Sequence, residues 1–157
     1  VSGICQGVAQ AALNSAMTAG GRIIGVLATA LNEPNQNDDA LCQQMARDHL
    51  ALSHFAAATR ETEETRLYRS LTMALICDAT IVVESGSSGS AVVQARESLR
   101  LGRTTFVLKS TVENRSIVWT RSLLRAGAQV LSKDNLGELS NAVEANVRAR
   151  FARCASR

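Results

Sequence analysis

The chain has little of several residue types, and each shortage narrows the functions that it can have. It contains one Trp, one Tyr and three Phe in 157 residues. Proteins that bind single strands by stacking bases on aromatic side chains need more aromatic residues. Any contact with nucleic acid should therefore go to phosphates. Only two histidines are present, and the four cysteines have no CxxC spacing, so the sequence predicts no metal site.

The sequence also lacks the signals of export and of membrane insertion. No apolar run approaches the roughly 20 residues that a membrane span needs, and no signal peptide is visible. Cys42 and Cys77 lie in apolar stretches and are expected to be buried, reduced thiols. We therefore expect a cytoplasmic protein without membrane contact. Its formal charge of +3 does not demand a polyanionic partner but permits one where arginines cluster.

Strand and helix patterns alternate along the whole chain. The apolar runs at 22–27 and 80–83 show no alternation with polar residues, which indicates strands buried on both faces. Repeated βαβ units predict an α/β fold: a Rossmann-like, doubly wound, mainly parallel sheet in three layers, forming one domain over residues 1–157. Residues 81–83 are expected in a central strand. The other expected strands lie near 50–55, 104–109 and 129–131, and helices are expected at 7–19, 39–50, 66–77, 90–101, 115–126 and 135–153.

The main candidate site is the turn between the strand near residue 80 and the helix that follows it. It holds Gly86, Ser87, Ser88, Gly89 and Ser90. A Gly/Ser turn at a helix N-terminus gathers unpaired N–H groups at the positive end of the helix dipole, which favours phosphate binding. Ser90 is expected to cap the helix. The alternative, a tight turn with no ligand, stays open.

Three basic residues could supply charge around this turn. Lys109 ends the next expected strand at the same edge of the sheet, whereas Arg66 and Arg69 lie on the helix expected at 66–77. The alternative for the arginines is a solvated helix face. The expected helix at 90–101 carries no carboxylate in its first turn, and Glu84 has no acidic partner for acid–base catalysis. We therefore predict no catalytic residue, no cofactor and no metal.

Several segments resemble the Rossmann-like domain of the DNA-processing protein A family (DprA/Smf). Val1-Ser2-Gly3 with Gln6-Gly7-Val8 resembles the family's SGxAxGID segment. The central segment from Asp78 to Arg96 is similar to DAVLVVEA…SGSLITAR. Further matches are GGRIIGVL at 20–27 to GGRTIAVL, LSHF at 52–55 to LSEF, LGRTTFV at 101–107 to LGRPVFAV and LLRAGA at 123–128 to LIRDGA.

The chain also departs from the family pattern. Ala9 and Leu13 stand where the family has an Asp and a His, and Arg66–Leu71 stands for FPRRNR without its Asn. The family's first strand, with a Gly-Ser-Arg motif, has no counterpart here. We expect either a piece of a longer protein or a divergent one that has replaced this βα unit, because a central strand cannot simply be omitted.

The resemblance implies binding of single-stranded DNA in DNA uptake and recombination, and it implies a recombinase as a further partner. The family is not known for catalysis in this domain. The alternative is a nucleotide-binding protein of the wider Rossmann-like group, which includes the LOG phosphoribohydrolases. A homodimer is a further candidate assembly. The sequence alone leaves open the identity of the ligand, the oligomeric state and the replacement of the missing strand.

Overall fold

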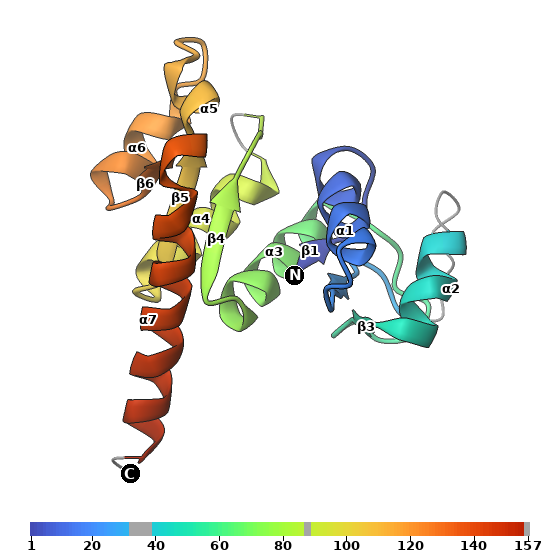
Figure 1. Ribbon diagram of the computed structural model, residues 1–157. Helices are drawn as coiled ribbons and strands as arrows, with labels where there is room; N and C mark the ends of the chain where they lie inside the picture. The colour runs from blue at the N-terminus through green and yellow to red at the C-terminus, as the bar shows by residue number, and fades with distance from the viewer. Residues whose placement is uncertain (32–38, 87–88, 156–157) are drawn as a thin grey trace. The chain divides into compact units, whose positions relative to one another are not determined.

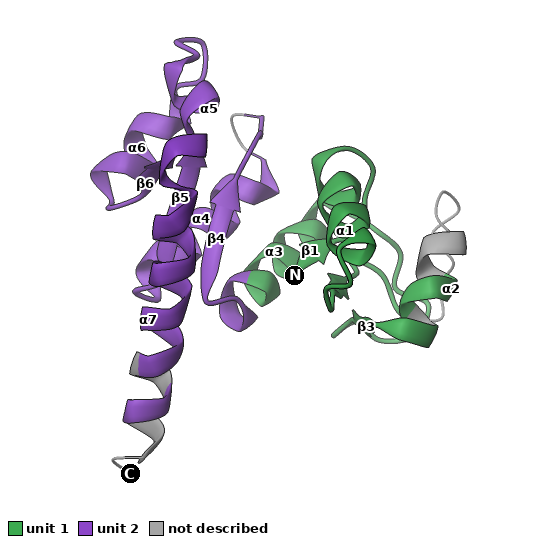
Figure 2. Cartoon of the chain, viewed as in Figure 1, with its two compact units in different colours: residues 1–73 green, residues 74–157 purple. Residues whose placement is uncertain are grey.

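The computed structural model describes residues 1–31, 39–86 and 89–155. The chain divides into two compact units, residues 1–73 and residues 74–157, which Figure 2 shows in different colours. The single domain expected over residues 1–157 stays a prediction.

Unit 1 is built on a three-stranded parallel sheet. Its strands are β1 (Ser2–Gly3), β2 (Ile24–Val26) and β3 (Leu50–Leu52), in the order β1-β2-β3. Its helices are α1 (Val8–Thr18), α2 (Asp39–Asp48) and α3 (Glu63–Ile76), whose last three residues belong to unit 2 (Figure 1). The sheet order and the helices between the strands are those of one half of a doubly wound fold.

The core of unit 1 forms where the second strand packs against α1 and α2. It contains Ile4, Leu13, Ile23, Leu27 and Met45. Met45 fits over β2 because Gly25 has no side chain: a Cβ at that position would lie 2.3 Å from the Met45 Cε atom. The expectation that the run at 22–27 is buried holds for Ile23, Val26 and Leu27, whereas Arg22 is exposed and Ile24 is half-buried.

Unit 2 also contains a three-stranded parallel sheet. Its strands are β4 (Ala79–Val82), β5 (Thr104–Leu108) and β6 (Gln129–Leu131), in the order β4-β5-β6. The helices of this unit are α4 (Ser90–Arg100), α5 (Lys109–Glu113), α6 (Trp119–Arg125) and α7 (Leu136–Ala155), and a 3-10 turn at Lys133–Asn135 precedes α7.

Helices cover both faces of the second sheet. Val82 and Val107, which are neighbours in the β4–β5 register, pack into one core with residues of α4 and α6. On the opposite face, the side-chain amide of Asn146 in α7 donates to the Asp78 carbonyl at 2.8 Å and to Thr104 Oγ1 at 3.0 Å. Residues 104 and 107 lie on opposite faces because side chains alternate along a strand. Unit 2 therefore has three layers, as the sequence predicts.

The α/β, Rossmann-like class is confirmed, but three details of the prediction are wrong. Residues 81–83 do not lie in a central strand: β4 is at an edge of its sheet, and Ile81 is 42% exposed. The described strands form two three-stranded sheets rather than one, so β4 has a partner on one side only. The helix expected at 115–126 is shorter, since α6 covers Trp119–Arg125 only, and the short helix α5 at Lys109–Glu113 was not expected.

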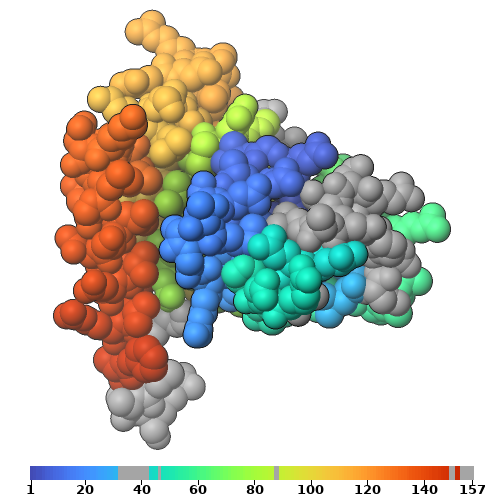
Figure 3. Space-filling model, turned by 45° about the vertical axis from the view of Figure 1, so that its right-hand side comes forward, coloured from blue at the N-terminus to red at the C-terminus, as the bar shows by residue number. Residues whose placement is uncertain are grey.

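The last helix is largely exposed. α7 spans 20 residues and lies open to solvent along the face drawn in Figure 3. Leu136 and Phe151 are among its exposed apolar side chains. No helix within the described ranges is long and apolar enough to span a membrane.

Candidate nucleic-acid interface

The described residues of the turn after β4 are hydrogen-bonded to one another. The N–H of Gly89 donates to the Gly86 carbonyl at 3.0 Å, and the Ser85 hydroxyl donates to the same carbonyl at 3.1 Å. A Cβ at Gly89 would lie 2.1 Å from Ser85 Oγ and 3.2 Å from the Gly86 oxygen. A side chain at position 89 therefore requires the Ser85 hydroxyl to rotate and the Gly86 backbone to shift by a few tenths of an ångström. Two of the candidate residues, Ser87 and Ser88, lie outside the described residues.

Helix α4 begins directly behind the turn. Gly89 is its N-cap, with φ −66° and ψ 150°, and its carbonyl accepts from the Val92 N–H at 2.9 Å. Ser90 is the first helical residue, so the expectation that Ser90 caps the helix is wrong: Gly89 already takes the extended conformation that a cap requires. No side chain caps this end and no acidic residue lies in its first turn. The positive end of the helix dipole is thus not neutralised by the protein.

Two side chains from later in the sequence hold the start of the turn. The indole Nε1 of Trp119 donates to the Ser85 carbonyl at 3.1 Å, and the hydroxyl of Thr111 donates to the Val83 carbonyl at 2.5 Å. Both residues are buried. The strand end is therefore held in position before any ligand arrives. The sequence does not reveal this role of Trp119, because a bond to a backbone carbonyl 34 positions away leaves no signal in the sequence.

Lys109 is the candidate cation closest in topology to the turn. It is the first residue of α5 and follows the last residue of β5 directly, rather than ending the strand as expected. The carboxyl ends of β4 and β5 share one edge of the sheet, because the two strands are parallel and Val82 is in register with Val107. The Lys109 side chain is 59% exposed, and its Nζ lies 3.9 Å from Glu113 Oε1. Such a surface pair leaves the ammonium group available to another anion.

The charge of the chain is concentrated in unit 2. Residues 74–157 carry twelve Lys and Arg against seven Asp and Glu, a formal charge of +5. Residues 1–73 carry five Lys and Arg against seven Asp and Glu, a formal charge of −2. The unit with the Gly/Ser turn is therefore the one with a field that attracts a polyanion.

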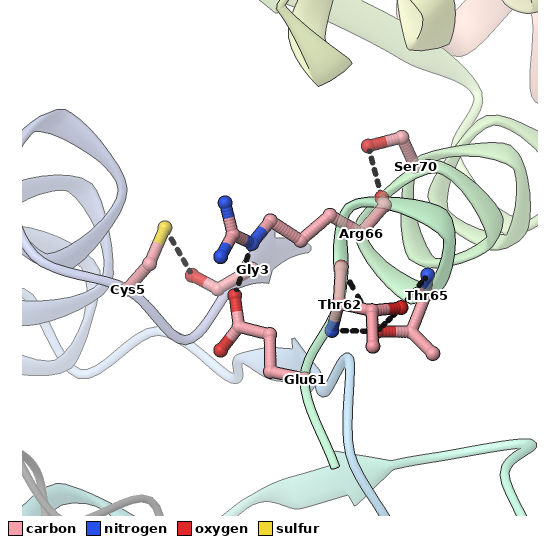
Figure 4. A network of polar contacts seen from close by, with 7 residues as sticks. All are labelled: Gly3, Cys5, Glu61, Thr62, Thr65, Arg66 and Ser70. Carbon is pink, nitrogen blue, oxygen red and sulfur yellow. Dashed lines mark hydrogen bonds and ion pairs between the residues drawn. The ribbon is translucent and has the colours of Figure 1, made fainter. Parts of the chain in front are cut away.

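The other two candidate cations belong to unit 1. Arg66 forms an ion pair between its Nε and Glu61 Oε1 at 2.7 Å, and Figure 4 shows its side chain reaching toward Gly3 and Cys5. Arg69 is only 6% exposed. Its Cζ atom would lie 3.1 Å from a Cβ built on Gly3, so the guanidinium group rests on the end of β1. The alternative of two solvated arginines does not hold for Arg69.

The remaining polar chemistry is sparse. In the described part of the chain, no three His, Cys, Asp or Glu side chains are arranged to hold a metal ion. Cys77 is a free thiol that is half-buried rather than buried, and burial raises its pKa. The Cys42 side chain lies outside the described residues. His54 is exposed, and its Nδ1 lies 3.1 Å from Thr72 Oγ1.

Comparison with known proteins identifies the family. The model of the family "DNA recombination-mediator protein A" matches residues 1–141. The chain belongs to this family. It is 27% identical over 137 residues to Protein Smf of Synechocystis sp. (strain ATCC 27184 / PCC 6803 / Kazusa), which covers 86% of this chain and 34% of that protein.

Two further matches come from Streptococcus pneumoniae. The DNA processing protein DprA of strain R6 is 25% identical over 134 residues, which are 84% of this chain and 47% of that protein. The X-ray structure of DprA from this species superposes with a TM-score of 0.74 at 23% identity and covers 83% of this chain and 46% of that one. This likeness shows the fold. The chain spans between a third and a half of the length of these relatives.

The relatives Smf and DprA share this family with the chain. The matched range takes in the turn at 84–90, its supports Thr111 and Trp119, and the candidate cations. The resemblance inferred from the sequence motifs is thereby confirmed.

Proposed function

We propose that this chain binds single-stranded DNA through its phosphates, with the turn at residues 84–90 as the central contact, and that it does so without catalysis. The observation that carries the proposal is the uncapped N-terminus of α4 behind Gly89, held in position by Trp119 and lacking any acidic residue in its first turn. Backbone N–H groups at such a helix end bind an oxyanion without any further rearrangement.

Charge and composition support DNA rather than a mononucleotide as the ligand. The +5 charge of residues 74–157 suits a chain of phosphates, and Lys109 lies at the same sheet edge as the turn. A nucleoside hydrolase would need a carboxylate beside the bound sugar, and α4 offers none in its first turn. Arg66 and Arg69 supply further positive charge in unit 1. A recombinase that receives the bound strand and a second copy of this chain are the proposed protein partners.

The experiment is a titration of a fluorescently labelled oligothymidylate with the protein at about 50 and about 200 mM salt, beside a panel of mononucleotides. Binding through phosphates should weaken steeply with salt, because bound counterions are released. Saturable binding of one mononucleotide with little salt dependence would contradict the proposal. Turnover of that nucleotide to the free base, lost in Glu84→Gln, would instead support a hydrolase.

A further inference from the structure

Helix α6 carries two exposed arginines on one face. Its opposite face packs into the core of unit 2, where Trp119, Thr120 and Leu123 are buried. Arg121 and Arg125 are both exposed, and their separation of four residues places them on the same side of the helix. Neither guanidinium group has an ion-pair partner among the described residues. Both are therefore available to an anion from outside the chain.

This charge pattern differs from that of the other helices of unit 2. In each of α4, α5 and α7 a basic residue pairs with an acidic residue three or four positions away. The pairs are Arg100 with Glu97, Lys109 with Glu113, and Arg148 with Glu144. α6 has no acidic residue, and residues 114–133 hold four Lys and Arg but no Asp or Glu. Two like charges four positions apart destabilise a helix, so the spacing of the α6 arginines does not serve the fold.

The position of Arg121 along the helix is also unfavourable for a cation. Arg121 lies in the first turn of α6, which begins at Trp119, and there its charge is close to the positive end of the helix dipole. Arg125 lies in the last turn, where the dipole favours a cation. The fold thus accounts for Arg125 but not for Arg121. Local preferences of this kind are broken mainly where a residue serves binding.

The helix with these arginines begins at the Gly/Ser turn. Its first residue, Trp119, donates from Nε1 to the Ser85 carbonyl at 3.1 Å. Arg121 follows two residues later, and Arg125 lies about 6 Å further along the axis, at the rise of an α-helix. That step is close to the separation of successive phosphates in an extended single strand. A strand bound at the turn can therefore continue along α6.

We propose that the exposed face of α6 extends the turn at 84–90 into a track for single-stranded nucleic acid, in which Arg121 and Arg125 each contact one phosphate. The planar guanidinium group suits this role, because it donates two parallel hydrogen bonds to one phosphate group. The inference rests on the proposed function, since the turn supplies the first contact to the strand. Contacts to phosphates carry no sequence information, so the track should serve all base sequences alike.

The test is fluorescence anisotropy with a labelled oligothymidylate of roughly 16 nucleotides, at salt concentrations between about 50 and about 200 mM. Arg121→Gln and Arg125→Gln should each reduce the slope of log affinity against log salt by about 0.7, and the double variant by about 1.4. Arg148→Gln is the matched control for a single variant. It removes one exposed charge from α7, which covers the opposite face of the sheet, and should leave the slope unchanged.

Urea unfolding separates a binding role of Arg121 from a structural one. Arg121→Gln removes a repulsive pair and a cation at the unfavourable end of the helix dipole, so the unfolding midpoint should stay the same or rise. Weaker DNA binding together with an undiminished midpoint supports the track. A lower midpoint would show that Arg121 stabilises the fold, and it would overturn the inference.

The outcomes of the DNA titration distinguish this inference from the proposed function. Binding by the wild type with an unchanged slope in the double variant would overturn the track and leave the turn at 84–90 as the site. No binding of oligothymidylate by the wild type would refute the proposed function and the track with it. Weaker binding of the double variant to phosphatidylserine vesicles, with its slope for oligothymidylate unchanged, would assign the surface to an anionic membrane and overturn the inference.

Discussion

The indole nitrogen of Trp119 donates a 3.1 Å hydrogen bond to the backbone carbonyl of Ser85, which ties the N-terminus of α6 to the first residues of the Gly/Ser turn. The two residues are 34 positions apart, and the Trp119 ring is 5% exposed within the core of unit 2. One side chain thus belongs both to the core and to the candidate interface. This relationship gives the first prediction.

Trp119→Phe should keep most of the packing and remove the hydrogen bond. We expect a loss of about 1–3 kcal/mol of unfolding free energy, from the lost bond and the smaller ring. Binding of oligothymidylate by the folded fraction should weaken, because the turn then orders only on binding. Urea unfolding and fluorescence anisotropy measure the two effects. Unchanged affinity would show that the turn needs no support from α6.

Gly89→Ala should weaken DNA binding more than it lowers stability. The added methyl group would meet Ser85 Oγ at 2.1 Å and the Gly86 oxygen at 3.2 Å, so the Ser85 hydroxyl must rotate away from the Gly86 carbonyl and the turn backbone must shift. Gly137→Ala is the matched control: it lies in α7 with no atom within 4 Å of the new Cβ, and it should stabilise the helix by up to about 1 kcal/mol without changing affinity. Equal DNA affinities in the two variants would contradict a role of the turn in DNA binding.

Lys109→Gln should flatten the salt dependence of DNA binding. Removal of one phosphate contact to a single strand reduces the slope of log affinity against log salt by about 0.7. Arg100→Gln is a suitable control, because Arg100 lies in the last turn of α4, away from its N-terminus, and pairs with Glu97 at 2.6 Å. If both variants change the slope equally, Lys109 acts through net charge alone.

Arg103→Met should destabilise the protein without altering DNA affinity. The guanidinium group donates to the carbonyls of Ala74 at 2.6 Å and Leu75 at 2.5 Å and to that of Cys77, so it satisfies the C-terminal end of α3. Hydrogen bonds from a charged group stabilise by about 1.5–3 kcal/mol each, and their loss is not additive. We expect a loss of about 3 kcal/mol in urea unfolding. A large loss of affinity in the folded variant would assign Arg103 to the interface instead.

The Cys77 thiol should make the protein less stable in alkaline solution. Burial raises its pKa in the folded state, so the unfolded chain loses this proton at a lower pH than the folded one. Stability should therefore fall as pH rises through the ordinary thiol value of about 8.5. Cys77→Ser should remove this part of the pH dependence. The comparison is made by urea unfolding at a series of pH values, and an identical profile in the variant would contradict it.

Local pattern was enough to predict the order of elements, the α/β class, the turn after β4 and the family. Apolar runs without alternation, as at Ile23 to Leu27, and a Gly/Ser segment between strand and helix depend only on neighbours in the sequence. Local pattern did not predict every helix end. Ser90 has a side chain that can cap a helix, but Gly89 is the N-cap of α4.

Only the tertiary structure decided which residues serve the candidate sites. Trp119 and Thr111 reach the strand end from other helices, Arg69 is buried against Gly3, and β4 lies at a sheet edge. Each of these facts depends on residues far apart in the sequence, whose contacts follow from packing and backbone hydrogen bonding rather than from local propensity. The sequence by itself determined where strands, helices and the Gly/Ser turn occur, because these follow from side-chain pattern and backbone preference. The tertiary structure alone decided which charges are paired, exposed or left buried without a partner.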